Sequence, residues 1–401
     1  MNRIMIIGND NYITNYLLNK GFYIDLILDK TDCDEELYPP VTNVNHFFVN
    51  DASNSTEVMS VMMQFRDTST EYFAIFSRYE HTIETASILG HLYPCKHEIP
   101  LNTSMNFRNK FIQKKILTEI VPVPKVQYIE RLENFSIHQL KLEFPIVYKP
   151  IDGEGTMNTG IIKNDEELLK IIKKLNDNNK MNLLLEEFIQ GEEFIIDGWV
   201  ENKKIQNFTI SKYNAPIINI KKGELISILN LHYKDHPSLY DNMKSFIYSS
   251  LNALQLNNGV FHMEVFIKKD GSIVFSECAM RIGGGLFKEI IDNIYDIDIL
   301  DYFIELNINN GVKKAERNDI RTGFSFLPNP KSIDSVLPSL NEIQKVFPQV
   351  KKVQYKWQTG EELPTYKENY INRIGFILVE GKSEEEVTNT INDIQKYFKN
   401  I

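Results

Sequence analysis

One stretch in the second half of the chain decides the fold: Gly259-Val-Phe-His-Met-Glu-Val-Phe-Ile-Lys-Lys-Asp-Gly-Ser-Ile-Val-Phe-Ser-Glu-Cys-Ala-Met-Arg281. Two apolar runs flank the pair Asp270-Gly271, which is a strong signal for a two-residue hairpin turn. Such a turn pairs residues symmetrically on either side of it, so Glu264 should face Glu277 with their Cβ atoms roughly 5 Å apart. The sequence therefore predicts a hairpin that holds two carboxylates side by side.

The alternation of side chains along a strand assigns the two faces of this hairpin. One face is expected to carry the chemistry (His262, Glu264, Phe266, Phe275, Glu277, Ala279 and Arg281) and the other to pack in the core (Met263, Val265, Ile267, Val274, Cys278 and Met280). Opposed carboxylates repel each other unless a cation lies between them, and magnesium accepts carboxylate and phosphate oxygens together. We interpret Glu264 and Glu277 as a metal-binding pair; the alternative is an exposed hairpin with solvated glutamates.

Length and composition narrow the class of protein. A chain of 401 residues is long enough for two or three domains, and 42% hydrophobic with 24% charged residues is typical of a soluble globular protein. The net charge of -10 and the lack of a block of Lys or Arg argue against nucleic acid or an anionic membrane as a partner. Small-molecule substrates are therefore expected.

The cysteines and the N-terminus indicate a cytoplasmic protein. Cys33, Cys95 and Cys278 are odd in number and have no Cys-x-x-Cys spacing, so they are expected to be reduced thiols rather than disulfides or zinc ligands. The apolar run near the start is too short for a signal peptide, and no window approaches the roughly 18 apolar residues of a membrane span.

Three units are predicted along the chain, an α/β domain over residues 1–104, a central unit over 105–310 and a closing unit over 311–401. Apolar runs alternate with helix-like stretches in the first unit, as in a doubly wound sheet. Gly8 follows the first run as a turn residue would, and the sequence there lacks the G-x-G-x-x-G fingerprint of dinucleotide binding.

The central unit is predicted to begin with a small α+β lid over about 122–198. Pro122 and Pro124 end a helical stretch that starts near Asn106, because proline removes a donor and restricts the preceding residue. Beyond residue 311 the chain is first polar and then predicts strands at 323–327 and 374–379 and an amphipathic helix at 383–398. We expect this last part to be a separate domain.

A lysine and a glycine-containing loop follow one strand of the predicted lid. Lys149 ends an apolar run, and Gly153 and Gly155 lie in the loop 152–160 that comes next. A lysine and bare backbone N–H groups can both contact phosphate, which suits a triphosphate. The loop is not a Walker A sequence, and an ordinary surface turn is the alternative.

A second strand of the predicted lid ends in acidic residues. The segment 183–198 contains Glu186, Glu187, Ile189 and Glu193 after a run of leucines. Extended backbone at this point could hydrogen-bond a flat heterocycle, although a purely structural strand would look the same.

Taken in order, these residues resemble the ATP-grasp superfamily from about residue 105 to residue 301. The resemblance implies that Lys110 and Lys149 approach the phosphates of ATP, with Gly153 and Gly155 in the loop over them. It also implies an adenine site at Glu186, Glu187 and Ile189, a ribose-binding carboxylate at Glu193, and metal binding by Glu264 and Glu277. Ala279 departs from the family pattern, because many members have a metal-binding Asn there.

The segments Phe261-His-Met-Glu264 and Glu277-Cys-Ala-Met-Arg281 are similar to the L-amino acid ligase branch, which forms dipeptides. The resemblance implies a mixed α/β and α+β architecture. It comprises a Rossmann-like pre-ATP-grasp domain, an ATP-grasp domain with a mobile lid, and a C-terminal closing domain. A homodimer is common among similar enzymes, so the resemblance makes a homodimer an expectation for this chain as well.

The resemblance implies a ligase that uses ATP and Mg²⁺, or Mn²⁺, to activate a carboxylate as an acyl phosphate and join it to an amine. Amino acids are the expected substrates. Arg281, with the backbone of Gly283 and Gly284, could stabilise the acyl phosphate or the oxyanion, or form a structural salt bridge. His262 could orient a substrate or accept a proton, or be a core residue. Trp199 and Glu80 are further candidates for the acceptor pocket.

The sequence is also compatible with two other functions. Another ATP-grasp ligase, of purine-pathway or carboxylase type, would share the nucleotide site and differ in its substrates. A regulatory protein that binds ATP without chemistry is the rival of a different class, and the Glu264, Glu277 and Arg281 set argues against it.

Overall fold

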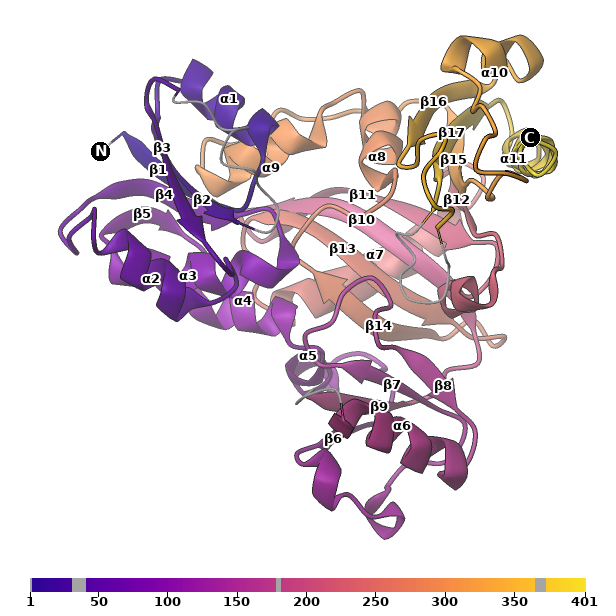
Figure 1. Ribbon diagram of the computed structural model, residues 1–401, viewed down its shortest axis with the longest axis horizontal. Coiled ribbons are helices and arrows are strands. Elements are labelled where there is room, and N and C mark those ends of the chain that lie inside the picture. Colours follow the sequence, from indigo (N-terminus) through magenta and orange to yellow (C-terminus); the bar gives the residue numbers. More distant parts are fainter. Residues whose placement is uncertain (1, 31–40, 178–181, 365–372) are drawn as a thin grey trace.

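The computed structural model describes residues 2–30, 41–177, 182–364 and 373–401, and Cys33 lies outside them. Three β-sheets organise the described residues, and Figure 1 shows a small sheet projecting from a larger body. The mixed α/β and α+β architecture predicted above is present, with one parallel and two antiparallel sheets among these residues. No helix of the described residues is long and apolar enough to cross a membrane. Cys95 and Cys278 are free thiols.

The N-terminal sheet is a five-stranded parallel sheet with the order β3-β2-β1-β4-β5, as expected for a doubly wound unit. Gly8 follows β1 with φ +99°, and a Cβ there would lie 2.5 Å from the Tyr79 ring, so glycine is required at this turn. The elements are β1 (Arg3–Ile7), α1 (Asn11–Asn19), β2 (Tyr23–Asp29), β3 (Val44–Val49), α2 (Ser55–Met62), β4 (Tyr72–Ser77), η2 (Glu80–Thr82), α3 (Ile83–Leu92) and β5 (Cys95–Glu98).

Two helices connect this sheet to the small sheet. Where one helical stretch was predicted from about Asn106, the chain forms α4 (Leu101–Arg108) and α5 (Lys110–Leu117). Asn109 separates them, and its side chain accepts the N–H groups of Phe111 and Ile112 as the N-cap of α5. The break lets α5 begin at Lys110, beside the small sheet.

The small sheet is antiparallel, with the order β6-β9-β7-β8, and projects below the body in Figure 1. It lies in the lid region that the sequence predicts, but the expected end at residue 198 was wrong, because residues 192–201 form a strand of the large sheet. Its elements are β6 (Val126–Ile129), η3 (Leu132–Asn134), η4 (Ile137–Gln139), β7 (Ile146–Pro150), β8 (Gly160–Ile162), α6 (Asp165–Asp177) and β9 (Leu183–Glu187).

The large sheet has eight strands in the order β14-β13-β10-β11-β12-β15-β17-β16. Residues 311–401 were expected to form a separate closing domain, but β15 pairs with β12, so the strands β15, β17 and β16 extend the central sheet. The predicted strands and the last helix are present, and Ser383 caps that helix. The elements are β10 (Glu192–Glu201), β11 (Lys204–Tyr213), η5 (Ile217–Lys222), β12 (Ser227–Leu231), α7 (Pro237–Ala253), β13 (Gly259–Ile267), β14 (Ile273–Ala279), α8 (Phe287–Tyr295), α9 (Ile299–Asn307), β15 (Arg321–Phe326), α10 (Leu340–Val346), β16 (Val350–Tyr355), β17 (Gly375–Gly381) and α11 (Glu384–Phe398).

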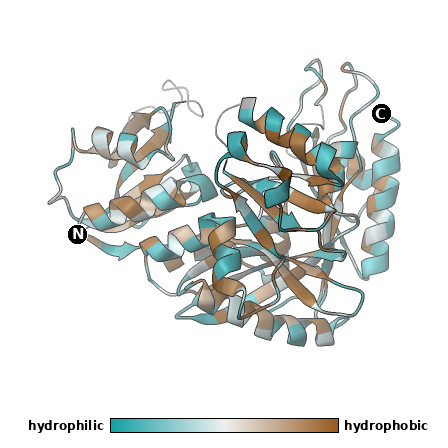
Figure 2. Ribbon diagram, turned by 90° about the horizontal axis from the view of Figure 1, so that it is seen from below, coloured by the Kyte–Doolittle hydropathy of each residue, from teal (hydrophilic) through white to brown (hydrophobic). Residues whose placement is uncertain are grey.

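The hydrophobic core joins the N-terminal sheet to the body. Figure 2 shows hydrophobic residues gathered on the strands inside the molecule and hydrophilic residues on the outer faces of the helices. One buried cluster includes residues of the N-terminal sheet, of α8 and α9 and of β15. The two parts therefore share one apolar interior.

Trp199 belongs to this interior. It lies on β10 and is 1% exposed, with its ring edge to face against Tyr295 of α8 and Tyr302 of α9 at centroid distances of 5.1 and 5.3 Å. Its suggested place in an acceptor pocket is therefore wrong. Trp199 instead fixes two helices to the large sheet.

Replacing Trp199 by Ala should lower the free energy of unfolding by about 3–5 kcal/mol, because it empties a fully packed aromatic site. Urea denaturation followed by far-UV circular dichroism measures this change. Trp199→Phe is the matched control and should cost much less, since among the described residues the indole N–H has no hydrogen-bond partner to lose. Equal losses in the two variants would contradict the packing argument.

Candidate active site

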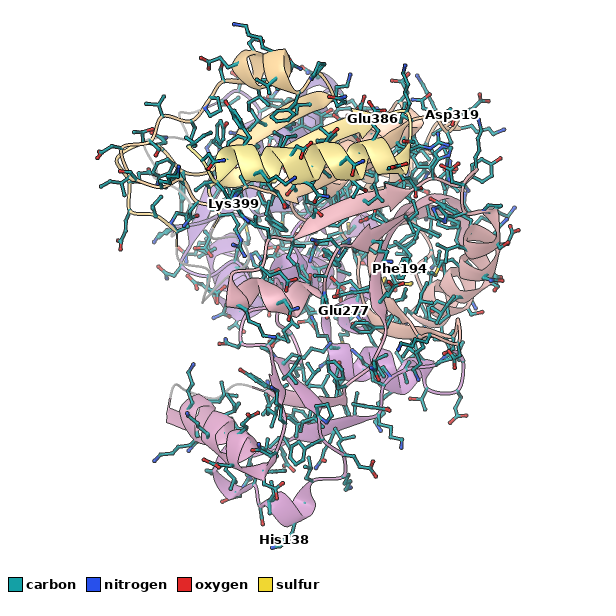
Figure 3. All side chains as sticks on the ribbon, turned by 90° about the vertical axis from the view of Figure 1, so that its right-hand side faces the viewer. His138, Phe194, Glu277, Asp319, Glu386 and Lys399 are labelled. Atoms are coloured by element: carbon teal, nitrogen blue, oxygen red, sulfur yellow. The ribbon has the colours of Figure 1, made fainter. Side chains whose placement is uncertain are left out.

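A cavity lies between the small sheet and the large sheet, and Figure 3 shows Glu277 at this level. It brings together most of the residues that the sequence singled out. Those that line it are Lys110, Lys149, Gly153, Gly155, Glu186, Glu187, Ile189, Glu193, His262, Glu264, Glu277, Arg281 and Gly284.

The carboxylate pair is present at the predicted register, since Glu264 of β13 lies opposite Glu277 of β14. The predicted two-residue turn is wrong, however. Lys268 donates its N–H to the Ser272 carbonyl at 3.0 Å, and Gly271 has φ +82°, so the loop has three residues, 269–271. The register near the turn is accordingly shifted by one residue from the prediction.

A β-bulge restores the predicted register before the glutamates. Val265 pairs with Phe275, whereas Glu264 pairs with Glu277, so Ser276 is the extra residue of β14. Phe275 therefore points into the core cluster with Val265, and its assignment to the chemical face was wrong. Ser276, rather than Phe275, lines the cavity.

Two lysines from different secondary-structure elements lie close to the Glu277 carboxylate. The ammonium nitrogens of Lys110, on α5, and Lys149, on β7, each lie 3.6 Å from Glu277 Oε2. Burial alone would raise the pKa of Glu277, but Lys110, Lys149, Lys114 and Arg281 lower it to about 2. Glu277 is therefore ionised, and both ammonium groups lie close to its carboxylate.

Glu186 links Lys149 to a third lysine. Its carboxylate lies 2.9 Å from Lys149 Nζ and 2.7 Å from Lys114 Nζ. Burial disfavours its charge, yet the two lysines hold the pKa of Glu186 below its ordinary value. Val147 pairs with Glu186 across β7 and β9, which places Lys149, two residues on, on the same face.

Sequence reasoning missed Lys114, although a signal was available. Lys114 lies four residues after Lys110 on α5, so the two side chains share one face of the helix. The Lys114 side chain is fully buried. Burial lowers its pKa to about 8, opposed by the attraction of Glu186.

The glycine-containing loop contacts the first of these lysines. Lys110 Nζ donates a hydrogen bond to the Gly153 carbonyl at 2.5 Å. Gly155 has φ +60°, a left-handed conformation that glycine adopts readily. Glu154, between them, lies 3.6 Å from His81 Nδ1 of the N-terminal unit. The loop therefore lies over the lysines and faces the N-terminal unit.

The residues expected for the nucleoside line the cavity beside the small sheet. Glu187 and Ile189 lie at the end of β9 and just beyond it, and Glu193 lies on β10. Glu193 Oε2 accepts the N–H of Ile217 at 3.0 Å. Burial, followed by repulsion from Glu264, raises the pKa of Glu193 to about 8.

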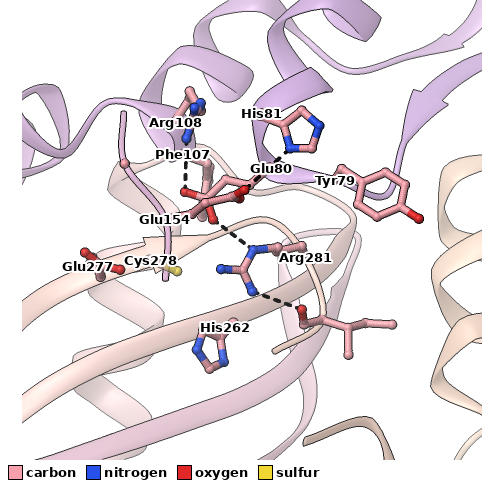
Figure 4. A network of polar contacts seen from close by, with 12 residues as sticks. Tyr79, Glu80, His81, Phe107, Arg108, Glu154, His262, Glu277, Cys278 and Arg281 are labelled. Carbon is pink, nitrogen blue, oxygen red and sulfur yellow. Dashed lines mark hydrogen bonds and ion pairs between the residues drawn. The ribbon is translucent and has the colours of Figure 1, made fainter. Parts of the chain in front are cut away.

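Arg281 is held by a buried carboxylate from the N-terminal unit (Figure 4). Its Nε donates to Glu80 Oε2 at 2.8 Å, and its Nη1 donates to the Ile282 carbonyl at 3.2 Å. Glu80 Oε1 also lies 3.5 Å from Arg108 Nη1. Glu80 does not line the cavity, so its suggested place in the acceptor pocket was wrong. Its carboxylate instead orients Arg281 through the hydrogen bond from Nε.

His262 is held by Asp197, a partner that sequence reasoning did not identify. Its Nδ1 lies 2.7 Å from Asp197 Oδ1, and its Nε2 lies 3.8 Å from Glu264 Oε1. Burial would lower the pKa of His262, but Asp197 raises it to about 9. A Cβ on Gly283 would lie 2.6 Å from His262 Nδ1, so glycine leaves room for the His262–Asp197 pair. Gly284 and Gly285 line the cavity, and Gly283 does not.

A divalent metal fits the donor groups at the hairpin. Among the described residues no group of three or more His, Cys, Asp or Glu side chains is arranged to hold a metal by itself. Glu264 and Glu277 provide two carboxylates, and Mg²⁺ is usually bound by one or two carboxylates together with substrate phosphates. Ala279 offers no ligand atom, as expected from its sequence.

A comparison with protein families indicates the fold family of this chain. Residues 142–289 match the family model of the ATP-grasp domain. The chain therefore has the ATP-grasp fold, and the family resemblance seen in the sequence is confirmed.

Two curated relatives with known activities are similar to this chain in sequence. An L-arginine-specific L-amino acid ligase of Bacillus subtilis is 26% identical over 65% of this chain and 64% of its own length. Dapdiamide A synthase of Enterobacter agglomerans is 25% identical over 37% of this chain and 36% of its own length. The chain thus spans less than two thirds of the length of these two relatives.

A solved structure covers nearly the whole chain. The L-amino acid ligase of Bacillus licheniformis superposes with a TM-score of 0.73, covering 99% of this chain and 97% of that one at 18% identity. The predicted similarity to the L-amino acid ligase branch is therefore confirmed as a resemblance.

Replacing Lys114 by Met should destabilise the protein by about 3–5 kcal/mol, because it leaves the buried Glu186 carboxylate with one cation fewer. Chemical denaturation measures the loss. Lys115→Met is the matched control, since the adjacent lysine is exposed, and it should stay within about 0.5 kcal/mol of the parent. A Lys114→Met variant as stable as this control would show that the buried pair is not stabilising.

Proposed function

We propose that the protein is an ATP-dependent ligase that activates a carboxylate, most simply that of an L-amino acid, and joins it to an amine to give an amide or dipeptide. One observation carries the proposal: Lys110 and Lys149 converge at 3.6 Å on Glu277, which lies opposite Glu264 in the cavity. Cations and acidic metal ligands in one site suit a triphosphate. The similarity to L-amino acid ligases supports the same chemistry.

In the first step, a substrate carboxylate oxygen attacks the γ-phosphorus of ATP, and ADP leaves. Lys110 and Lys149 hold the phosphates that are not transferred. Glu264 and Glu277 would hold Mg²⁺, or Mn²⁺, which offsets negative charge on the transferring group when bound. Positioning and charge stabilisation supply most of the catalysis in such a transfer.

In the second step, the amine attacks the acyl carbon, the C–O bond to phosphate breaks, and inorganic phosphate leaves while the nitrogen releases a proton to phosphate or solvent. We assign Arg281 to the acyl phosphate and the tetrahedral oxyanion, with the Gly284 backbone beside it. We assign His262, whose Nδ1 lies 2.7 Å from Asp197 Oδ1, to substrate orientation. Closure of loop 152–160 would exclude water from the acyl phosphate.

ADP and phosphate release should require both Mg-ATP and an amino acid in a pairwise panel of L-amino acids, with a product mass equal to a dipeptide. Glu277→Gln should reduce this release by at least about 100-fold, because it removes a charge that the transfer needs. Glu192→Gln is the control, since its side chain on β10 is 65% exposed, and it should keep the parent rate.

The rival functions give different results in the same assay. Release that needs bicarbonate or a nucleotide intermediate instead of amino acids would favour a purine-pathway or carboxylase type of ligase. Binding of ATP with no stimulated ADP release by any substrate would favour a regulatory protein. Unchanged activity in Glu277→Gln would remove the metal-binding assignment.

Glu80→Ala should lower kcat by about 10- to 100-fold while changing ATP affinity much less, since Glu80 holds Arg281 without lining the cavity. Glu80→Gln keeps an acceptor oxygen and should recover part of kcat. Steady-state kinetics with separate KM values measure this split. Equal effects on kcat and ATP affinity, with no recovery in Glu80→Gln, would indicate a general structural role instead.

A further inference from the structure

The cavity continues beyond the phosphate-binding lysines into a second, apolar part, which we term the apolar lobe. Its walls come from η5, β12, α8 and β15, elements that lie far apart in the sequence. The lobe residues are Ile217, Ile218, Ile228, Phe287, Phe324 and Phe326. A wall of this kind removes a ligand's apolar side chain from water.

The apolar lobe adjoins the groups assigned to the substrate. The Phe287 ring lies 5.3 Å from the imidazole of His262, and 5.1 Å from the Phe324 ring. Gly285 completes the boundary, since a Cβ there would lie 3.1 Å from the Phe324 ring. A substrate held at its polar end by Arg281 and His262 would therefore direct its side chain into the lobe.

Among the residues that the structure describes, the apolar lobe has no carboxylate to pair with a basic side chain. The acidic residues of the cavity are engaged elsewhere: Glu186 with two lysines, Glu187 with the Lys125 N–H, and Glu154 near His81. Glu264 and Glu277 form the metal-binding pair. Glu193 is buried, and its Oε2 already accepts the Ile217 N–H at 3.0 Å.

Positive charge lies behind the aromatic wall. The guanidinium of Arg373 lies 5.8 Å from the centroid of the Phe326 ring, and Lys356 Nζ lies 5.1 Å from that of Phe376, which packs on Phe326. Arg373 is 1% exposed. These contacts place cationic groups against the aromatic rings of the wall.

We propose that the apolar lobe is the side-chain pocket of one amino acid substrate and selects an aliphatic or aromatic side chain over a basic one. The proposal rests on the proposed ligase function and specifies its substrate class. It distinguishes this chain from its arginine-specific relative, whose specificity is for a basic amino acid. Burying an ammonium or guanidinium group without a counter-charge is costly, so the discrimination should be large.

The test measures amino-acid-dependent ADP release by the full-length protein with Mg-ATP. L-leucine, L-methionine and L-phenylalanine should each give a kcat/KM about 100-fold or more above L-lysine and L-arginine. Thermal shift with L-phenylalanine or L-arginine alone provides a binding readout that does not depend on turnover. Only the apolar amino acid should raise the melting temperature.

Ile218→Asp tests whether the lobe is responsible. Ile218 is half-buried and lines the cavity, so the carboxylate would face the substrate side chain. The variant should lose at least about 10-fold in kcat/KM for L-phenylalanine and gain for L-lysine and L-arginine. Ile120→Asp makes the same change at a 48% exposed residue outside the cavity lining and should leave the preference unchanged.

The outcomes separate this proposal from the function on which it rests. Release that is fastest with L-arginine or L-lysine would leave the ligase function in place and overturn the apolar preference. An unchanged preference in a folded Ile218→Asp variant would also overturn it. No release with any amino acid would remove the ligase function, and the proposed pocket with it.

Discussion

The Glu186 carboxylate lies between the ammonium groups of Lys114 and Lys149, and the rest of the site depends on this buried ion pair network. Removing such charges from water is expensive unless each has a close partner. The network joins α5 to the two central strands of the small sheet, and Lys149 extends it to Glu277 on the large sheet. The same charges that fix the small sheet to the body therefore form the part of the cavity that suits phosphate.

The N-terminal unit contributes to this cavity without lining it. Glu80 holds Arg281, and His81 lies near Glu154 of the loop over the lysines. A shared apolar core, in which Trp199 packs against α8 and α9, holds the N-terminal sheet in place against the large sheet. The proposed catalytic arginine is thus oriented by a carboxylate that is 201 residues away in sequence.

In the β13–β14 hairpin, local sequence patterns predicted the pairing of the glutamates correctly and the turn incorrectly. Asp270-Gly271 correctly marked the turn, and Glu264 does face Glu277, but the loop has three residues and Ser276 forms a bulge that compensates for the shift. Strand alternation alone placed Phe275 on the wrong face, because a bulge reverses the alternation beyond it. The C-terminal strands were likewise predicted individually, whereas the pairing of β15 with β12 was not.

The sequence by itself indicated the ATP-grasp fold through its resemblance to that family. It also determined the order of the lysines and acidic residues and the opposed Glu264 and Glu277, because these depend on spacing within single strands and turns. Only the tertiary structure decided that Lys114 pairs with Glu186, that Asp197 holds His262, that Glu80 supports Arg281 and that Trp199 is core. Each of these contacts joins elements whose relative placement is set by burial and sheet pairing across the whole chain. The apolar lobe has the same origin, since four separate elements form its walls.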